Sequence, residues 1–568
     1  MSTIQRAKQQ ILTDLKSAIG KEYTPTMEEL SYPPDAKMGD LSFACFALAK
    51  GLKRNPAEIA TELTAKIPPV GFVKSVAAIG PYVNFTLDDA TFGDAVLGEI
   101  VETAAAYGTS TAGGEKSVMV EYANLNTHKD VHIGHLRNLL VGQAAVALYR
   151  ANGYRVIPVT YINDLGAHVA SCVWAVKNVG GGKPAEGEDN ITFLQRMYVE
   201  AVKQAEENPK VKEEISKVQR ELEAGEGPLR AVWKSTHKWS VAYLKMVYKE
   251  FKLPLETWYF ESDFIKKTKQ TIERLIKQGI VTSSQGAWIV DLESEGLGAN
   301  LLVKTDGTLL YNAKDLALAL QKEEDYHPQR SVYVIDARQS LVMKQLFATL
   351  QRMGFKKELQ HLSYEFVTLK EGAMSSRTGN VIRYEPFRDE VLALARKETK
   401  SRHEEWTDKQ IEKTAHAVAF AAVRFGMLKQ DLDKKIVFDV KEALAFDGFT
   451  GPYLLYTFAR VQSLKRKAGR LKPVYTGTFA RIAVEHRLLT TMARYPEVVF
   501  AAGQHARISL VAQYLFELAQ TMAEYYEQVP ILSSEGVEKA ARLGTLVAAG
   551  RVLENGLHLL GVDTIDEM

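Results

Sequence analysis

The spacing of apolar residues divides the chain into three regions of different character. Residues 1–112 mix helical and β-like patterns, which predicts a small α+β domain. Between residues 113 and 386, apolar β-branched runs alternate with helical patterns, as in a doubly wound parallel sheet. From residue 387 to 568 nearly every apolar pattern has helical spacing, which predicts an all-α bundle. We therefore expect a multidomain α/β protein.

The central region also contains a predicted insertion. A glycine-rich break at residues 180–189 and the polar helical stretch after it place this insertion at about 180–290. The elements expected before the bundle are helices over Ile4–Ile19, Leu41–Lys53 and Leu136–Tyr149, and strands over Gly80–Leu87, Val118–Tyr122, Tyr154–Tyr161, Leu301–Lys304 and Ser331–Ile335. The helices expected in the bundle are Lys409–Lys429, Tyr453–Lys467, Phe479–Tyr495, Ile508–Glu527 and Glu535–Leu560.

Composition narrows the class of protein. The 568 residues are 46% hydrophobic and 25% charged, as in soluble globular proteins. No apolar run reaches the ~18–20 residues that cross a membrane, and the N-terminus lacks a secretory pattern. The net charge of +2 means that any nucleic-acid-binding surface has to be local. Two distant cysteines, Cys45 and Cys172, exclude a disulfide scaffold, and we expect a cytoplasmic protein.

A histidine pair is the strongest chemical motif. Residues 121–138 read E-Y-A-N-L-N-T-H-K-D-V-H-I-G-H-L-R-N, with His132 and His135 on either side of Gly134. A strand, a short loop and a helix N-terminus favour phosphate, because free N–H groups and the helix dipole attract anions. Both imidazoles share one face of the first turn, and Gly134 leaves room for a flat ring. Two surface histidines at a helix start are the alternative interpretation.

A second candidate phosphate site follows about 240 residues later. Residues 371–380 read E-G-A-M-S-S-R-T-G-N, and an apolar, strand-like run leads into them. Arg377 and two hydroxyls lie between glycines, in a loop that could move and clamp a polyphosphate. Alone, this pattern is more typical of an ordinary surface loop.

Together the two motifs resemble the signatures of class I aminoacyl-tRNA synthetases. Residues 132–135 match the first signature, and residues 374–377 resemble a degenerate second one in which Arg377 is the only cation. Further blocks are similar to arginyl-tRNA synthetases, namely residues 80–85, 121–138, 162–166, 306–315, 451–460 and 560–568. This resemblance implies a Rossmann-like catalytic domain, an N-terminal additional tRNA-binding domain and a C-terminal anticodon-binding bundle.

The resemblance also implies where L-arginine binds. The family holds the guanidinium with two acidic residues and a tyrosine, and the α-amino and carboxylate groups with an Asn and a Gln; the matching positions are Glu121, Asp315, Tyr311, Asn126 and Gln339. A permanent planar cation needs fixed carboxylates, which agrees with the two acids. From the residues alone, Asp315 could instead pair with Lys314 or Lys322, and Tyr311 could belong to the core.

The resemblance places ATP beside the histidine pair. The residues expected to bind ATP are His132, His135, Gly134, Met374, Ser375 and Ser376. Because the second signature has lost its lysines, we expect Lys129 to supply the charge that meets the departing pyrophosphate, with Arg377 second. A solvated loop lysine is the alternative interpretation.

Two further positions have less defined expectations. Val342 stands three residues after Gln339, where the family usually has a histidine, so that contact is dispensable or comes from another group, while Gln345 is retained. Asp164 follows a strand and is expected near the active site without a specific role.

An RNA-binding surface is expected in the bundle. Between Arg460 and Arg494, nine Lys or Arg stand against one acid, Glu485. Nearby aromatics could stack on bases, although helical spacing of aromatics more often indicates core. The expected tRNA contacts are Tyr453, Tyr456, Arg460, Lys465 and Arg466. Residues 1–112 carry ten basic and thirteen acidic residues, so shape and a few polar contacts would have to bind tRNA there.

The predicted function is ATP-dependent ligation of L-arginine to its tRNA through an arginyl-adenylate, with AMP and pyrophosphate as products. The resemblance implies that tRNA is needed for activation. Mg²⁺ is expected to accompany ATP, although no protein ligand cluster for it is visible, and a monomer is expected. The alternatives are a nucleotidyltransferase, a non-catalytic RNA-binding paralogue, and a synthetase for another amino acid, of which lysine is nearest.

Overall fold

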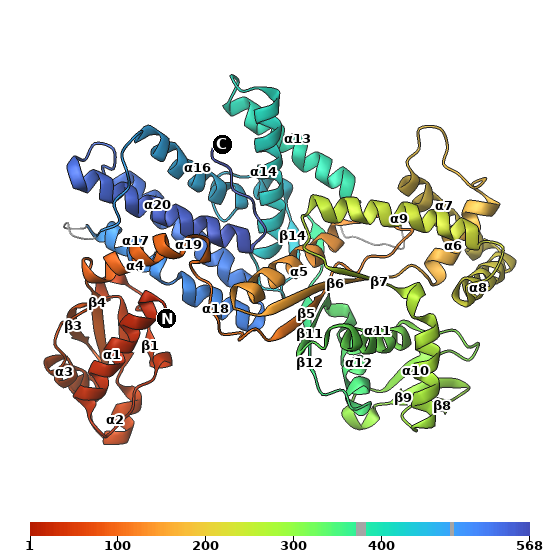
Figure 1. Cartoon of the computed structure of the whole chain (residues 1–568), viewed down its shortest axis with the longest axis horizontal. Coiled ribbons are helices and arrows are strands. Elements are labelled where there is room, and N and C mark those ends of the chain that lie inside the picture. The colour runs from red at the N-terminus through yellow and green to blue at the C-terminus, as the bar shows by residue number, and fades with distance from the viewer. Residues whose placement is uncertain (371–381, 477–481) are drawn as a thin grey trace.

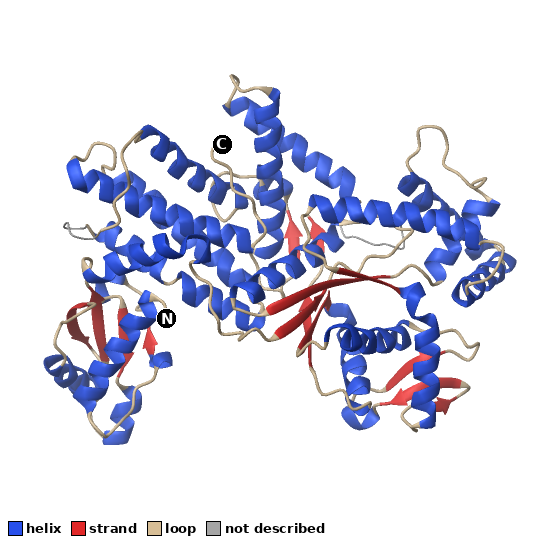
Figure 2. Cartoon of the chain, viewed as in Figure 1, coloured by secondary structure: helices blue, strands red, loops and turns tan. Residues whose placement is uncertain are grey.

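The computed structural model describes residues 1–370, 382–476 and 482–568. The N-terminal domain and the central sheet domain lie at opposite ends of the molecule, and the C-terminal helices lie between them (Figure 1). Strands are confined to the N-terminal domain, to the central domain with its insertions, and to one short pair beside the helices (Figure 2). The multidomain α/β class predicted from the sequence is confirmed.

The N-terminal domain is an antiparallel sheet of order β1-β2-β4-β3 packed with helices. Its elements are α1 (Thr3–Ile19), β1 (Leu30–Ser31), β2 (Leu41–Ala44), α2 (Phe46–Leu52), α3 (Pro56–Lys66), β3 (Val73–Ile79), β4 (Tyr82–Leu87) and α4 (Thr91–Thr103), with short 3-10 turns at Met27–Glu29, Ala36–Met38 and Ala104–Ala106. The prediction of one helix over Leu41–Lys53 was wrong in its first half. Leu41, Ser42 and Phe43 are all buried in β2, and a short apolar run does not reveal its period.

Ion pairs attach the N-terminal domain to the bundle. The imidazole of His486 lies between two carboxylates, 2.7 Å from Asp89 Oδ1 and 2.8 Å from Asp40 Oδ1. These two carboxylates outweigh burial and raise the pKa of His486 to about 9. Lys8 Nζ also lies 2.7 Å from Glu497 Oε1. The first domain is therefore attached to the bundle by ion pairs in which it contributes both acidic and basic groups.

The central domain is a five-stranded parallel sheet of order β12-β11-β5-β6-β7. Its strands and connecting helices are β5 (Ser117–Glu121), α5 (Ile133–Ala151), β6 (Arg155–Ile162), α6 (Ala167–Asn178), β7 (Thr257–Phe260), α11 (Tyr311–Tyr326), β11 (Arg330–Asp336), α12 (Ser340–Arg352) and β12 (Glu358–Tyr364). Every residue of β5 is buried, as expected for a strand covered on both faces. The chain leaves β5 toward β6 on one side and later returns to β11 on the other, so the order reverses at β5.

Two segments are inserted into this sheet. The first, between α6 and β7, is helical and comprises α7 (Asn190–Glu207), α8 (Pro209–Ala224) and α9 (Arg230–Glu250). The second, between β7 and α11, contains the 3-10 turns Glu261–Phe264 and Glu293–Glu295, α10 (Ile265–Lys277), and a three-stranded antiparallel sheet of β8 (Thr282–Ser284), β9 (Ala287–Asp291) and β10 (Ala299–Val303). The insertion predicted at about 180–290 thus also spans β7 of the main sheet, and the strand expected at Leu301–Lys304 belongs to the small sheet.

The C-terminal part is helical. Its elements are α13 (Tyr384–Arg402), α14 (Asp408–Leu428), α15 (Val440–Ala443), α16 (Gly451–Lys467), α17 (Ala483–Ala493), α18 (Tyr495–His505), α19 (Ile508–Gln528) and α20 (Gly536–Leu559). One parallel strand pair, β13 (Val367–Leu369) with β14 (Ile436–Phe438), joins it to the central domain, across the domain boundary predicted at residue 387. None of the described helices is long and apolar enough to cross a membrane.

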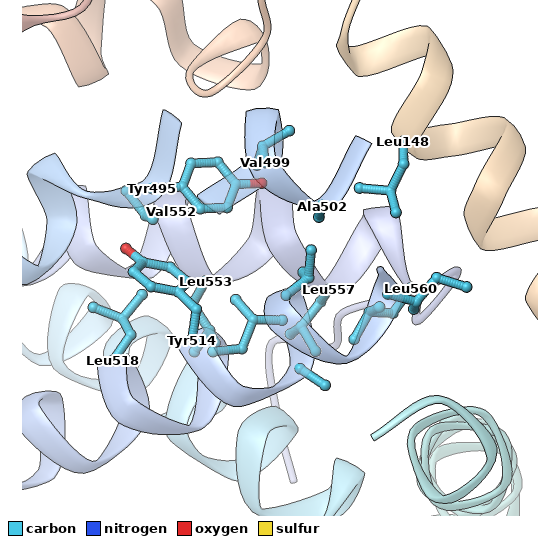
Figure 3. Close-up of a cluster of buried hydrophobic side chains, with 14 of the residues drawn as sticks. Leu148, Tyr495, Val499, Ala502, Tyr514, Leu518, Val552, Leu553, Leu557 and Leu560 are labelled. Carbon is cyan, nitrogen blue, oxygen red and sulfur yellow. The ribbon is translucent and has the colours of Figure 1, made fainter. Parts of the chain in front are cut away.

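Helix α5 connects the sheet to the bundle. Leu148, near its C-terminal end, packs into a buried cluster with Val499 and Leu560 of the bundle region (Figure 3). Asn152, which ends the helix, donates from Nδ2 to the carbonyl of Val499 at 3.1 Å. The 19-residue helix is about 28 Å long. One rigid element therefore runs from the histidine pair to the C-terminal helices.

Candidate active site

A cavity of about 470 Å³ opens at the carboxyl ends of β5, β6 and β11. This is the point where the strand order reverses, the usual ligand position in open α/β sheets. The cavity is lined by the predicted site residues Glu121, Asn126, His132, Gly134, His135, Tyr311, Asp315 and Gln339. Residues more than 200 positions apart thus meet in one hollow.

The two histidines form a stacked pair at the N-terminus of α5. His132 is the N-cap residue, and its backbone N–H donates to Nδ1 of His135 at 3.2 Å. The ring centres are 3.5 Å apart. Burial, aided by the nearby charge of Lys129, lowers the pKa of His132 to about 4 and that of His135 well below its usual range. Both rings are therefore neutral at pH 7 and act as hydrogen-bond partners rather than as cations.

The loop before the histidines is fixed by His128. This buried residue has a φ of 60°. Its ring lies between Thr127 Oγ1 at 2.9 Å and Thr236 Oγ1 at 2.7 Å, and its backbone N–H donates to Ser240 Oγ at 3.0 Å. Since Thr236 and Ser240 belong to α9, the first insertion holds the loop that carries the next residue, Lys129.

Lys129 is not among the residues that line the cavity in the described part of the chain. Its ammonium is 5.0 Å from the ring centre of Tyr198 on α7, and burial lowers its pKa. Its charge contributes to the lowered pKa of both His132 and His135, and it precedes His132 by three residues. The side chain is half-buried, so it retains freedom to turn toward an anion.

The second signature, with Met374, Ser375, Ser376 and Arg377, lies outside the described residues, but the segment that follows it is at the site. Ile382 accepts at its carbonyl from the N–H of Ile133 at 3.2 Å, and Tyr384 donates from its N–H to the carbonyl of Val131 at 2.8 Å. Backbone hydrogen bonds therefore connect this segment to both sides of His132.

Glu121 is held from two sides at the end of β5. It is 3% exposed; Oε1 accepts from Asn124 Nδ2 at 2.7 Å, and Oε2 accepts from the ammonium of Lys322. Lys322, on α11, is 1% exposed and lies 4.1 Å from the ring centre of Tyr333. The carboxylate of Glu121 is thus fixed in a buried ion pair at the wall of the cavity.

Asp315 lies one turn after Tyr311 on α11, as predicted from the spacing. Burial, followed by the neighbouring Glu121 charge, raises the pKa of Asp315 to about 8. Tyr311 is 49% exposed at the mouth of the cavity, so it is not a core residue. The ion pairs of Lys314 and Lys322 are with other acids, Glu261 and Glu223 for the first and Glu121 for the second.

Gln339 and Gln345, six residues apart, have different roles. Gln339 lines the cavity, whereas Val342 is not part of the lining within the described chain. Gln345 is buried on the other side of α12 and donates from Nε2 to the carbonyl of Leu297 at 2.8 Å. It therefore supports the second insertion. The valine that stands at position 342 in place of the usual histidine therefore leaves the described lining of the cavity unchanged.

Asp164 is a buried structural anchor near the site. Its Oδ1 accepts from the N–H of Ser262 at 2.8 Å, and its Oδ2 lies 3.1 Å from Nε2 of His237. Its carbonyl accepts from Trp233 Nε1 at 2.9 Å. The residue joins the loop after β6 to α9 and to the turn after β7, and it does not line the described cavity.

Several lining residues escaped sequence reasoning. They are Asn124, Asn138, Tyr161, Asn163, Asp336, Arg338 and Tyr364. Asn138 joins the two strands at the reversal point, accepting from the N–H of Ala123 at 2.7 Å and donating to the carbonyl of Val334 at 2.7 Å. Arg338 is paired with Asp336 at 2.7 Å, and its charge contributes to the low pKa of His132. Its position next to Gln339 in the sequence could have indicated that Arg338 lies at the cavity.

No group of three or more His, Cys, Asp or Glu side chains able to hold a metal ion occurs among residues 1–370, 382–476 and 482–568. The acids of the cavity do not fit a metal cage, because Glu121 is paired with an ammonium.

The predicted RNA-contact residues lie on α16. Arg460 stacks on the ring of Tyr526 at 3.9 Å and lies 5.6 Å from that of Tyr456; both tyrosines are exposed, at 37% and 36%. Tyr453 differs, since its ring packs edge-on against Phe516 with centres 5.8 Å apart. Arg460 and Tyr456 therefore present a cation and an aromatic face to the surface, whereas Tyr453 is directed toward the core.

Part of the positive charge near α16 is already neutralised. The basic side chains of residues 460–494 that pair with acids from other segments include Arg466 with Glu567, Arg487 with Glu524 and Arg494 with Glu517. Lys465 is exposed, and Arg481 lies outside the described residues. The count along the sequence overstated the available charge, because the compensating acids come from α19 and the C-terminus.

The reversed sheet order, the histidine pair at a helix N-terminus and the cavity between them define a class I aminoacyl-tRNA synthetase. A family model described as the catalytic domain of class I (R) tRNA synthetases matches residues 97–440, with a DALR anticodon binding domain at 454–568 and an arginyl tRNA synthetase N terminal domain at 5–87. The chain belongs to the arginyl-tRNA synthetase family.

Individual relatives agree along the full chain. The chain is 36% identical to the arginine–tRNA ligase of Bdellovibrio bacteriovorus, with 98% of each chain covered. It is 31% identical to that of Clostridium perfringens, with 99% of this chain and all of the relative covered. The Thermus thermophilus arginyl-tRNA synthetase structure aligns with a TM-score of 0.78 at 26% identity over 99% of this chain and 100% of the other. The alternatives of a nucleotidyltransferase or a non-catalytic paralogue are not favoured.

Proposed function

We propose that the protein ligates L-arginine to its tRNA in two steps within the cavity described above. The carboxylate of arginine attacks the α-phosphorus of ATP and pyrophosphate leaves; a terminal ribose hydroxyl of tRNA then attacks the acyl carbon and AMP leaves. One observation supports this most strongly: a cavity with two carboxylates at one end and a helix N-terminus with two neutral histidines at the other. No side chain has to act as a nucleophile, since alignment and charge stabilisation suffice.

Arginine would bind at the carboxylate end. Glu121 and Asp315 would receive the guanidinium, whose planar donors suit two carboxylates, and the exposed ring of Tyr311 would cover it at the mouth. Asn126 and Gln339 would hold the α-amino and carboxylate groups, which places the reacting oxygen toward the histidines. The lining position of all five residues supports these roles.

ATP would bind at the histidine end. His132 and His135 would hydrogen-bond the phosphates, and Gly134 would border the adenine. Lys129 would meet the charge that develops on pyrophosphate, with Arg377 second; the closeness of Lys129 to the histidine pair supports the first of these. Met374, Ser375 and Ser376 would complete the ATP site. Mg²⁺ would enter with ATP, held mainly by the phosphate oxygens and neutralising part of their charge.

Transfer RNA would contact α16 through Tyr456, Arg460, Lys465 and Arg466, with a smaller share for the half-buried Tyr453. We expect tRNA to be needed for arginine activation, and helix α5 is a physical connection between the two regions. Arg460→Ala should weaken tRNA binding about tenfold in a filter-binding assay, because it removes both a charge and a stacking face. Lys409→Ala, on the exposed start of α14, is the matched control.

The amino acid and the tRNA requirement can be tested together. Purified protein is incubated with ATP, Mg²⁺, total tRNA and each amino acid in turn, and charging is measured by acid-stable label on tRNA. Arginine alone should be charged, and pyrophosphate exchange should require tRNA. Charging with lysine, or arginine-dependent exchange without tRNA, would contradict the proposal.

The monomeric state and the cytoplasmic location remain predictions from the sequence. Light scattering during gel filtration tests the first, since a monomer should have a mass of 63.3 kDa. Fractionation of cells tests the second.

A further inference from the structure

A buried lysine lies directly behind the carboxylates of the cavity. Lys322 follows Asp315 by seven residues, so it shares the same face of α11 two turns on. Only 1% of its surface is exposed. It does not line the cavity that the described residues form, and the reaction proposed above does not use it.

The partners of Lys322 explain why a buried ammonium is tolerated. Burial alone would lower its pKa, but the Glu121 carboxylate and Tyr333 outweigh this effect and raise the pKa above its ordinary value. The ammonium donates to Glu121 Oε2, while Asn124 donates to Oε1 at 2.7 Å. Both oxygens of the Glu121 carboxylate are therefore held, one by a residue three positions away and the other by a residue 201 positions away.

The charges that meet at this end of the cavity can be counted. Glu121 and Asp315 are the two lining acids, and Lys322 pairs with the first. The titratable groups that face them come from several elements: Tyr161 on β6, Tyr259 on β7, Glu261 after β7, Lys314 on α11 and Tyr333 on β11. Lys314 forms its own cluster with Glu261 and Glu223 outside the cavity lining.

We propose that Lys322 is a positioning residue for arginine: it fixes the orientation of the Glu121 carboxylate and offsets one of the two lining charges. When Glu121 and Asp315 are both ionised, the Lys322 ammonium leaves this group with one net negative charge. A single guanidinium neutralises that charge. This inference rests on the proposed roles of Glu121 and Asp315.

Two uncompensated carboxylates in one cavity would behave differently. Like charges at close range disfavour ionisation of both, so the pKa of one of them would rise beyond the value of about 8 that Asp315 has with Lys322 nearby. A proton would then compete with arginine more strongly over the physiological pH range. Lys322 reduces this competition without touching the guanidinium.

The test compares Lys322→Met with Lys322→Arg, which keeps the charge. Aminoacylation is measured at saturating ATP and tRNA from pH 6.5 to 9. In Lys322→Met the KM for arginine should rise on the order of 100-fold, because a buried pair has lost one partner. Its pH dependence should move to higher pH, whereas the KM for ATP stays within about twofold. Lys322→Arg should largely restore both values.

Lys267→Met is the matched control. Its ammonium lies 2.6 Å from Glu324 of α11 on the outer surface, away from the cavity. It should leave the KM for arginine and its pH dependence unchanged. A wild-type KM and pH profile in a folded Lys322→Met variant would overturn the inference.

A second pair of variants covers the case in which Lys322→Met does not fold. Glu121→Gln leaves the ammonium buried without a carboxylate, and Glu121→Gln/Lys322→Met removes both charges. The double variant should bind arginine more tightly than Glu121→Gln, by roughly tenfold, and a double variant equal to or worse than Glu121→Gln would overturn the inference. A wild-type KM in Glu121→Gln would instead overturn the proposed role of Glu121 itself.

Discussion

The two ends of the cavity treat charge in opposite ways. At the arginine end, Glu121 is buried and fixed by an ion pair with Lys322. At the phosphate end, the histidines are neutral, and the nearby cations, Lys129 and Arg338, have half-buried or exposed side chains. The difference follows the ligands: a guanidinium keeps its charge throughout the reaction, so a rigid counter-charge suits it, whereas pyrophosphate develops charge and leaves, so its partners have to move with it.

Burial acts on both ends but with different consequences. It raises the pKa of Asp315 to about 8 and lowers the pKa of His132 to about 4, so both groups tend to be neutral in the empty cavity at pH 7. A bound guanidinium reverses this effect for Asp315, because an opposite charge favours the carboxylate. In the empty cavity the Lys129 charge acts on the histidines in the other direction, because it repels their protonated forms. The guanidinium of arginine therefore favours ionisation of the acid that it meets, whereas the protein's own cation keeps the histidines neutral.

Removing the carboxylate of Asp315 should have the largest effect on the contrast between the two ends of the cavity. Asp315→Asn keeps the shape but leaves the guanidinium facing an amide, so kcat/KM for arginine should fall by about 10³-fold or more. The KM for ATP should change little, since Asp315 lies at the other end. Steady-state aminoacylation at varied arginine measures both values.

Glu324→Gln is the control for Asp315→Asn. It removes a carboxylate from the outer face of the same helix, where Glu324 pairs with Lys267. Equal losses in both variants would indicate damage to α11 rather than loss of a guanidinium contact, and an unchanged kcat/KM in Asp315→Asn would remove Asp315 from the arginine site.

Removing the cation at the other end should have the next largest effect. Lys129→Ala is expected to slow adenylate formation by about 10²–10³-fold, the usual cost of losing one group that stabilises developing charge. The KM for arginine and the melting temperature should be nearly unchanged, since the ammonium has only an aromatic neighbour, Tyr198, among the contacts described above. The rate is measured as single-turnover adenylate formation with tRNA present.

Lys245→Ala is the matched control for Lys129→Ala. Its ammonium likewise lies over an aromatic ring, 5.8 Å from the centre of Trp258, but outside the cavity lining. A near-normal rate of adenylate formation in Lys129→Ala would contradict the proposed role of Lys129 and leave Arg377 or another cation to meet the pyrophosphate.

The sequence located the two acids of the arginine end but not their surroundings. The strand end at Glu121 and the i, i+4 spacing from Tyr311 to Asp315 follow from sequence periodicity, whereas their expected role in binding arginine comes from the resemblance to arginyl-tRNA synthetases. Lys322 appeared in the sequence only as a possible partner of Asp315. Its actual partner is Glu121, 201 residues away, and helical spacing carries no information on such a contact.

The same limit explains the errors elsewhere. The apolar residues of Leu41–Phe43 fit helix and strand equally well over so short a run, and pairing with β4 decided the outcome. The basic residues between Arg460 and Arg494 looked unopposed in the sequence. Two acids that pair with them, Glu517 and Glu524, lie further along the chain on α19. Elements and their order were predictable from spacing, whereas ion pairs between distant segments required the fold.

The smallest expected effect is the pH dependence, which separates the two ends without any mutation. In the empty cavity, burial and Glu121 raise the pKa of Asp315 to about 8, so this carboxyl is protonated below that pH and ionised above it. Arginine remains a cation throughout, and it binds the ionised form. The KM for arginine should therefore rise as pH falls below about 8, approaching roughly a tenfold increase per pH unit well below that value.

His132, with a pKa of about 4, stays neutral over the same range, so the KM for ATP should show no step between pH 6 and 8 that is due to this ring. Steady-state KM values for both substrates from pH 6 to 9 measure the contrast, and Asp315→Asn should abolish the arginine dependence. A step near pH 6.5 in the ATP profile, with a flat arginine profile, would reverse the assignment of neutral and ionised groups to the two ends.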